Sequence, residues 1–163
     1  MKHVTIPDSI LLSVEKPARY IGNEIGAIYK DPEKTPVRIA FCYPDVYEVG
    51  MSHLGLQILY GDFNRMDNVY CERVFAPWRD MEEQLRTHNI PLYTLETYTP
   101  VRDMDFLAFT LQYEMSFTNV LNVLDLSGIP LYAKDRTDRD PLVIAGGPTA
   151  CNPMVLAPFI DFF

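Results

Sequence analysis

The chain has 163 residues, of which 48% are apolar and 22% charged, so it can bury the core of one ordinary domain. Its formal net charge of −8 argues against a basic surface for nucleic-acid phosphates. Its three cysteines, Cys42, Cys71 and Cys151, form no CxxC or CxxxCxxC pair, which argues against a zinc or iron–sulfur site made by this chain alone.

The cysteines and the N-terminus also indicate the compartment. Three isolated, buried or half-buried thiols suit a reducing cytoplasm. The first residues do not form a secretory signal, because Pro7 and Asp8 break the opening segment. The apolar runs are too short to cross a membrane. We therefore predict a soluble, cytoplasmic protein without a membrane partner.

Residues 1–36 mix apolar, charged and turn residues without a sustained period, and we interpret them as an N-terminal arm and linker. Lys16 and Arg19 form a small basic patch in this acidic chain. They either contact an anion or a partner, or are two solvated charges on the arm. Residues 37–163 are predicted to form an α/β domain.

The first strand is predicted at residues 37–42, an apolar run that suits the middle of a parallel sheet covered on both faces. Pro44 ends it, because proline cannot donate to a sheet ladder. A loop follows at 45–51, and Ser52 is predicted to cap a helix. The apolar positions of that helix are Leu54, Ile58, Leu59 and Phe63.

A second strand is predicted at 69–75, which is β-branched and aromatic. Pro77 suits the first turn of the next helix. This helix would place Trp78, Met81 and Leu85 on one face and stop at Asn89 and Pro91, with Trp78 as a core or interface anchor rather than a ligand stacker.

Further strands and helices continue the alternation. Strands are predicted at 92–97, toward a sheet edge, at 105–111 and at 141–145, and a helix capped by Ser116 at 117–126, closing at Gly128. Such alternation predicts an α/β fold with a doubly wound, mainly parallel, flavodoxin-like sheet. Residues 160–163 look like one more strand with nothing after it to cover the sheet, so we expect the chain to be continued by something larger.

The loops at 44–52, 112–116 and 146–153 should meet at the carboxyl edge of the sheet, where α/β proteins bind ligands. The first loop lacks the lysine of a phosphate loop, and no GxGxxG follows a strand. Gly146 and Gly147 either let a ligand approach the edge closely or only supply positive φ in a tight turn. His53 could ligate a metal, hydrogen-bond a ligand or be a packing residue. No hydrolytic nucleophile setting is present, so we assign no catalytic residue.

Four motifs carry a resemblance to a known family. They are CYPD at 42–45, GMSHLGL at 50–56, FTLQYE at 109–114 and AGGPT at 145–149. Together they resemble the N-terminal cobalamin-binding-like domain of radical SAM proteins, and more narrowly a large, uncharacterised radical SAM family. Residues 16–22 (KPARYIG) and 73–78 (RVFAPW) also find counterparts there.

The resemblance implies a cobalamin-binding-like domain placed ahead of a radical SAM barrel. That barrel would hold a [4Fe–4S] cluster on CxxxCxxC and cleave S-adenosylmethionine, and it would be the partner of this chain in cis or in trans. The cluster motif is not in these 163 residues, so we predict a chain that is not catalytic alone.

Cobalamin is the cofactor that the resemblance implies for this domain itself. The DxHxxG loop that can supply the lower cobalt ligand is absent. Tyr47 stands two residues after Asp45, where the motif has histidine, and Leu56 stands three residues after His53, where the motif has glycine. A corrinoid either binds without a histidine ligand, or the domain has lost it. We predict no metal ligand, and these candidate cofactor-binding residues: Ser52, His53, Thr110, Gln112, Gly146, Gly147, Pro148 and Thr149.

Two functions therefore stay open. The first is a cobalamin-binding-like module of a radical SAM protein. The alternative is a non-catalytic interaction or regulatory domain that has lost corrinoid binding. A flavin carrier is less well supported, because no Ser/Thr-rich phosphate loop follows the first strand.

Overall fold

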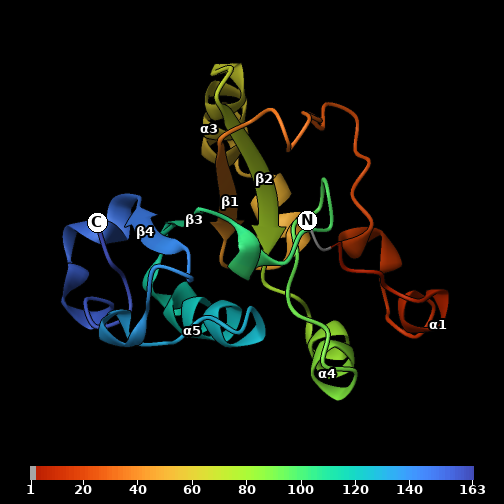
Figure 1. The fold of residues 1–163 in the computed structure, drawn as a ribbon. Coiled ribbons are helices and arrows are strands. Elements are labelled where there is room, and N and C mark those ends of the chain that lie inside the picture. The colour runs from red at the N-terminus through yellow and green to blue at the C-terminus, as the bar shows by residue number, and fades with distance from the viewer. Residues whose placement is uncertain (1–2) are drawn as a thin grey trace.

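The computed structural model describes residues 3–163, and their central feature is a parallel sheet (Figure 1). Its strands are β1 (Val37–Tyr43), β2 (Val69–Phe75), β3 (Phe106–Thr110) and β4 (Leu142–Gly146), in the order β2-β1-β3-β4. All three neighbouring pairs are parallel. This order is that of flavodoxin-like sheets. The predicted α/β, doubly wound parallel fold is confirmed.

Helices cover both faces of the sheet. On one face, α3 (Leu54–Arg65) packs against β1 and β2. On the other face lie α4 (Arg79–Thr87) and α5 (Phe117–Leu126). Two short helices are α1 (Asp8–Leu11) and α2 (Tyr47–Met51). Single 3₁₀ turns occur at Pro17–Tyr20, Val101–Asp103, Glu114–Ser116, Ala133–Asp135, Pro148–Cys151 and Pro153–Val155.

The central strand β1 shows why its sequence has no polar alternation. Phe41 and Tyr43 join the core under α3, whereas Ala40 and Cys42 join the core under α4 and α5. Residues 38–43 are all buried. A strand that is covered on both faces must be apolar at successive positions, as the sequence predicted.

The start of α3 differs from the prediction. His53, not Ser52, is the N-cap residue, and its Nδ1 accepts a hydrogen bond from the Leu56 amide at 3.1 Å. Ser52 lies one position earlier, where its hydroxyl donates to the carbonyl of Val49 at 2.9 Å. The cause is the additional helix α2, which occupies part of the predicted loop and ends just before Ser52.

Of the four residues predicted for the apolar face of α3, Phe63 packs against the core and the other three are exposed. Leu54, Ile58 and Leu59 are 71%, 53% and 43% exposed. The buried residues are Leu56, Tyr60 and Asn64. The polar groups of Asn64 and Tyr60 form hydrogen bonds with the backbone of neighbouring segments. The side-chain amide of Asn64 donates to the Cys71 carbonyl and accepts from the Cys71 N–H, and the Tyr60 hydroxyl accepts from the Ile28 N–H. Hydrogen bonds from the arm and from β2 therefore select this face over the more apolar one.

Residues 92–97 do not form the predicted edge strand. They belong to a buried loop beside β2, in which the Leu95 amide donates to the Arg73 carbonyl at 3.0 Å. The loop has one isolated antiparallel bridge, between Tyr93 and Pro100. The chain turns back at Tyr98, which has a φ of 54°. The alternation of apolar and polar residues that predicted a strand thus belongs to a loop segment that lies along the edge of β2.

The helix α4 begins at Arg79, with Trp78 as its N-cap residue. Met81 and Leu85 are each 1% exposed and form the predicted buried face, but Trp78 is 45% exposed and so is not a core anchor. Its ring instead lies 5.6 Å from the guanidinium carbon of Arg19. Asn89 has a φ of 52° and ends the helix as predicted.

The helix α5 has the predicted bounds and is followed by Gly128 with a φ of 67°. Ser116 occupies the N-cap position, but its hydroxyl donates to the Tyr113 carbonyl instead of accepting from the helix. Residues 160–163 reach β4 through a single parallel bridge, Ile144 to Phe162, and so do not form the predicted strand.

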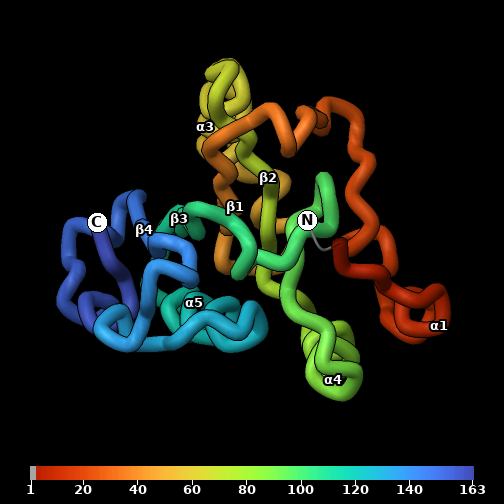
Figure 2. The backbone as a smooth tube through the Cα atoms, viewed as in Figure 1, coloured from red at the N-terminus to blue at the C-terminus, as the bar shows by residue number. Residues whose placement is uncertain are grey.

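The N-terminal segment runs along the β2 side of the sheet (Figure 2). Ile10, Val14 and Tyr20 are buried in the core under α4 and α5. The segment is thus packed on the domain; a domain boundary at residue 36 stays a prediction. Within residues 3–163, no helix combines the length and apolar character that a membrane span requires.

Candidate functional site

A cavity of about 310 Å³ lies at the carboxyl ends of β1, β3 and β4, on the face that α3 covers only in part. The chain passes from β1 to β2 on one side and from β3 to β4 on the other, so β1 and β3 flank the topological switch point. Such a point is where open α/β sheets bind ligands. The apolar lining consists of Phe41, Leu59, Phe63, Ala108 and Ile144, with Phe109 and Ala145 contributing from the same strands.

Two consecutive glycines at the end of β4 have different physical roles. A Cβ on Gly146 would meet nothing within 4 Å, so its absence leaves the cavity open. A Cβ on Gly147 would lie 2.5 Å from the Leu111 carbonyl oxygen, and the φ of Gly147 is 111°. Gly147 is therefore required by the close approach of two backbones. The interpretation as a ligand wall fits Gly146, and the interpretation as a tight turn fits Gly147.

The polar groups of the cavity lie along its rim. Thr110 ends β3, is 6% exposed and accepts a hydrogen bond from the Gln112 amide at 2.7 Å. His53 is half-buried on the opposite wall, and its ring centroid lies 5.2 Å from that of Tyr43. A mainly apolar cavity with a few placed polar groups is the usual character of a small-molecule site.

The structure brings five of the eight predicted residues to this cavity: His53, Thr110, Gln112, Gly146 and Gly147. The other three do not line it. Ser52 is exposed and bonded to Val49, Pro148 begins a 3₁₀ turn, and the Thr149 hydroxyl donates to the Leu111 carbonyl at 3.2 Å. These three residues were predicted because they belong to loops at the carboxyl edge of the sheet. Membership of a loop does not determine the direction of a side chain.

The apolar wall was not predicted as part of the site. Three of its members occupy alternate, same-face positions of neighbouring strands, because Phe41 is paired with Ala108 and Ala108 with Ile144. Strand parity could have identified these residues, since side chains alternate across a sheet. Leu59 was expected on the apolar face of α3, and Phe63 does pack against the core there while it also lines the cavity.

The loops that carry the rim are held together by side-chain bonds. The Tyr113 hydroxyl donates to the Asp45 carboxylate, and the Asn119 amide donates to the Pro44 carbonyl at 2.9 Å. Burial, together with the nearby Asp45, raises the pKa of Tyr113, so the phenol stays protonated and donates. These bonds connect the segment after β1 to the segment after β3, one on each side of the switch point.

No group of three or more His, Cys, Asp or Glu side chains within residues 3–163 is arranged to hold a metal ion. Cys42 and Cys71 are buried, and Cys151 is exposed. Burial raises the pKa of Cys42, which keeps the thiol protonated and unreactive.

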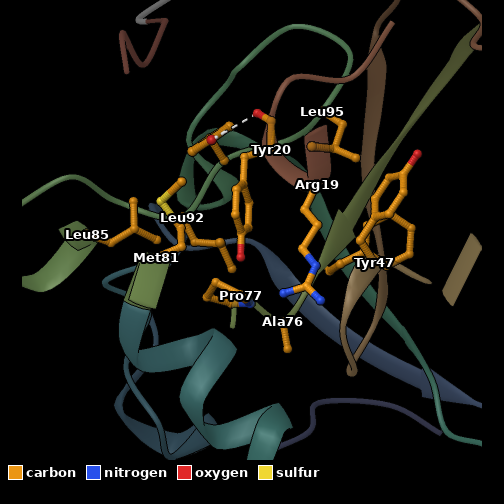
Figure 3. Close-up of a pocket in the computed structure, with 11 residues that line it drawn as sticks. Arg19, Tyr20, Tyr47, Ala76, Pro77, Met81, Leu85, Leu92 and Leu95 are labelled. Atoms are coloured by element: carbon orange, nitrogen blue, oxygen red, sulfur yellow. Dashed lines mark hydrogen bonds between the residues drawn. The ribbon is translucent and has the colours of Figure 1, made fainter. Parts of the chain in front are cut away.

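A second, smaller cavity lies beyond the end of β2 (Figure 3). Its volume of about 20 Å³ is room for one water molecule. Here the KPARYIG segment meets the RVFAPW segment: Arg19 and Tyr20 lie against Ala76 and Pro77, and the Tyr20 hydroxyl accepts from the Trp78 amide at 3.1 Å. The two segments are therefore in contact in the fold, although they are far apart in the sequence.

The basic patch of the arm is used within the chain. Lys16 and Arg19 bind the two oxygens of Glu48 in α2, at 3.0 Å and 2.9 Å. The hydrogen bond from Arg19 is the main cause that lowers the pKa of Glu48 to about 2. The anion that these two side chains contact is therefore a carboxylate of the same chain, and a contact with a partner stays a prediction.

Sequence reasoning missed three ion pairs made by buried residues of β2. Arg73 is 2% exposed and binds Glu96 at 2.6 Å and Glu24 at 2.7 Å. Glu72, on the other face, binds Arg38. The available signal was the adjacent Glu-Arg pair inside an otherwise apolar strand, since charged residues are almost never fully buried unless they are paired.

The fold and the cavity define an α/β domain of flavodoxin-like topology with a ligand-type pocket at its switch point. The model of the family described as radical SAM proteins, N-terminal, matches residues 55–163, which is more than half of the chain. The chain belongs to this family.

One curated relative is an uncharacterized protein of Methanocaldococcus jannaschii, 26% identical over 128 residues. The match covers 77% of this chain and 22% of that protein, so the chain spans about a fifth of the relative's length. No solved structure matches the chain significantly.

Proposed function

We propose that this chain is a cobalamin-binding-like module of a radical SAM protein and that the cavity beside Gly146 takes the nucleotide tail of a corrinoid. The single observation that carries the proposal is the position of this cavity, at the β1–β3 switch point of a chain that belongs to a radical SAM N-terminal family.

The residues present fit such a group. The tail ends in a flat, mostly apolar base, and the cavity has an apolar floor made by the sheet, with Leu59 and Phe63 of α3 at its side. Gly146 leaves room that any larger side chain would fill. Thr110, Gln112 and His53 supply the polar rim. When bound, a corrinoid supplies cobalt-centred group-transfer chemistry; this chain's part is to hold and orient the cofactor.

The module would act with a radical SAM barrel, in cis or in trans, that carries the [4Fe–4S] cluster and S-adenosylmethionine. We propose no reaction for the module alone, whose part would be to bind the cofactor. The free thiols of Cys42, Cys71 and Cys151 support a reducing compartment, and we place the protein in the cytoplasm.

The test is a titration of the purified full chain with hydroxocobalamin, followed by corrinoid absorbance and by equilibrium dialysis. We expect saturable binding that is lost in Gly146→Leu, whose side chain would fill the cavity. Gly61→Leu is the matched control, because a Cβ on Gly61 also meets nothing within 4 Å and Gly61 does not line the cavity. No saturable binding by the wild-type chain, or equal binding by both variants, would overturn the proposal.

A second candidate is a non-catalytic interaction domain, favoured by the exposed apolar side chains of α3. Leu54, Ile58 and Leu59 stand on one helix and leave an apolar strip in contact with solvent. If this strip binds the barrel, Leu54→Ser/Ile58→Ser abolishes co-purification with a family barrel domain expressed in trans. Under this candidate the wild-type chain binds no hydroxocobalamin, whereas under the first proposal it does and Leu54→Ser/Ile58→Ser leaves that binding unchanged.

A further inference from the structure

The ring of His53 has one nitrogen whose role is fixed by the backbone. Nδ1 lies 3.1 Å from the amide nitrogen of Leu56, in the first turn of α3. A backbone amide is always a donor, so Nδ1 must be the acceptor in this bond. In the neutral ring the only proton therefore sits on Nε2.

A histidine that binds a metal through Nε2 needs the opposite arrangement. Its Nε2 lone pair faces the metal, and its Nδ1 carries the proton and donates it to a carboxylate or carbonyl. Here Nδ1 is held by an N–H group, and no hydrogen bond to Nε2 is found within residues 3–163. The Leu56 amide also donates to the His53 carbonyl at 3.1 Å. While the capping bond to Nδ1 is kept as well, His53 does not act as a cobalt ligand through Nε2.

The same bond leaves Nε2–H as the donor of the His53 ring, and His53 lines the cavity. The ring lines the cavity together with Gly55, whose position is so close that a Cβ there would lie 2.8 Å from His53 Cε1. The Tyr43 ring lies beside the imidazole, with 5.2 Å between the ring centroids and an angle of 48° between the ring planes. An oriented N–H at the rim of an apolar cavity selects a ligand that carries an acceptor at its edge.

We infer that His53 is a specificity-determining donor: its Nε2–H binds an acceptor atom of a flat, mainly apolar heterocycle in the cavity, and no protein nitrogen from this residue reaches a metal. The inference rests on the proposed function for the identity of the ligand. The protonation pattern of His53 is a property of the ligand-free chain and can be tested without it.

The first experiment is a long-range ¹H–¹⁵N spectrum of the ligand-free full chain at pH 8. We expect the Nε2–H tautomer for His53, assigned by comparison with His53→Asp. An Nδ1–H tautomer would overturn the inference, whether or not any corrinoid binds.

The second experiment compares benzimidazole with indole by NMR titration. The two rings have nearly the same shape, but indole lacks the acceptor nitrogen of benzimidazole. We expect benzimidazole to bind the wild-type chain about five- to tenfold more tightly, the value of one neutral hydrogen bond. Equal binding of the two rings to the wild-type chain would overturn the inference.

The matched variant is His53→Asp, which keeps an N-cap acceptor for α3 and removes the N–H donor. In this variant the two rings should bind equally, while the melting temperature stays near that of the wild type. A preference for benzimidazole that survives the substitution would assign the donor to another residue.

A third measurement separates the inference from the proposed function. If the chain binds cob(II)alamin, its electron paramagnetic resonance spectrum should be the same with ¹⁴N- and ¹⁵N-labelled protein. A label-dependent splitting would show a protein nitrogen on cobalt and overturn the inference. An absence of cobalamin binding with the expected tautomer would instead overturn only the proposed function.

Discussion

The two edges of the sheet are built in opposite ways (Figure 1). At the β2 edge, the N-terminal segment and the loop around Leu95 lie against the strand, and all residues of β2 are buried. At the β4 edge, residues near Phe162 make one bridge, and Leu142 and Phe162 are 45% and 63% exposed. The difference separates a side of the domain that is closed by its own chain from a side that is open to a ligand or a partner.

Charge is what closes the β2 edge. Glu96 accepts from both the backbone and the side chain of Arg73, and Glu72 accepts from the Thr94 and Thr97 hydroxyls and from Arg38. Each buried charge therefore fixes a segment that is distant in sequence. A buried ion pair adds little net stability compared with apolar residues, but it permits few alternative arrangements. We interpret the pairs as the contacts that hold the loop against β2.

At the β4 edge, one face of the strand is only partly covered. Along β4, Val143 and Ala145 face the core under α5 and are buried, whereas the alternate residues Leu142 and Ile144 face the α3 side and are exposed or half-buried. The cavity lies on this incompletely covered face.

The largest effect is expected from Arg73→Met at the closed edge. The variant leaves Glu96 and Glu24 without their cation, and we expect a loss of about 3–5 kcal/mol in the free energy of unfolding. Urea unfolding at pH 7 measures it. The control is Arg65→Met, which breaks an exposed pair with Asp62 and should cost less than about 1 kcal/mol. A similar small loss for both variants would show that the buried pairs do not hold the edge.

The two glycines at the open edge should respond differently to alanine. Gly147→Ala places a Cβ against the Leu111 backbone at a positive φ, and we expect a loss of about 1–3 kcal/mol. Gly146→Ala points into open space and should change stability by less than about 0.5 kcal/mol. Thermal unfolding of both variants checks this. Equal losses would remove the distinction between a structural and a cavity-opening glycine.

Hydrogen exchange should show the contrast between the edges without a substitution. The Arg73 amide donates to the buried Glu96 carboxylate, whereas the Ala145 amide donates to the Phe162 carbonyl of an exposed residue. We expect protection of Arg73 to exceed that of Ala145 by at least about tenfold, because local opening needs less free energy where few contacts are broken. Equal protection factors in native-state exchange would mean that the β4 edge is as firmly closed as the β2 edge.

The smallest effect concerns the bond between the arm and α2. The pKa of Glu48 is lowered from its ordinary 4.5 to about 2, so its ion pairs with Arg19 and Lys16 stabilise the fold above pH 4.5 and are lost as the pH falls toward 2. Glu48→Gln should flatten the pH dependence of the unfolding free energy between pH 2 and 4.5. Above pH 4.5 the slope of stability against pH should be the same as in the wild type. Acid unfolding followed by circular dichroism measures it; identical acid profiles for the variant and the wild type would show that the arm is held by its apolar contacts alone.

Much of the candidate site followed from local sequence. Gly146, Thr110 and Gln112 come at strand ends, and carboxyl ends of parallel strands always share one edge, so their convergence could be predicted. The N-cap residue of α3 could not be predicted from local sequence. Ser52 is the better cap former by residue type, but α2 extends to Met51 and moves the start of α3 so that His53 takes the position.

The sequence by itself determined the four strands of the sheet, their parallel class and the helix α5, because apolar runs, glycines and prolines act through local geometry. Only the tertiary structure decided which face of α3 is buried, how residues 92–97 cover β2, and which of the two glycines opens the cavity. These outcomes depend on hydrogen-bond partners and backbone contacts far away in the chain, such as Asn64 with Cys71 and Gly147 with Leu111, and no local pattern encodes them.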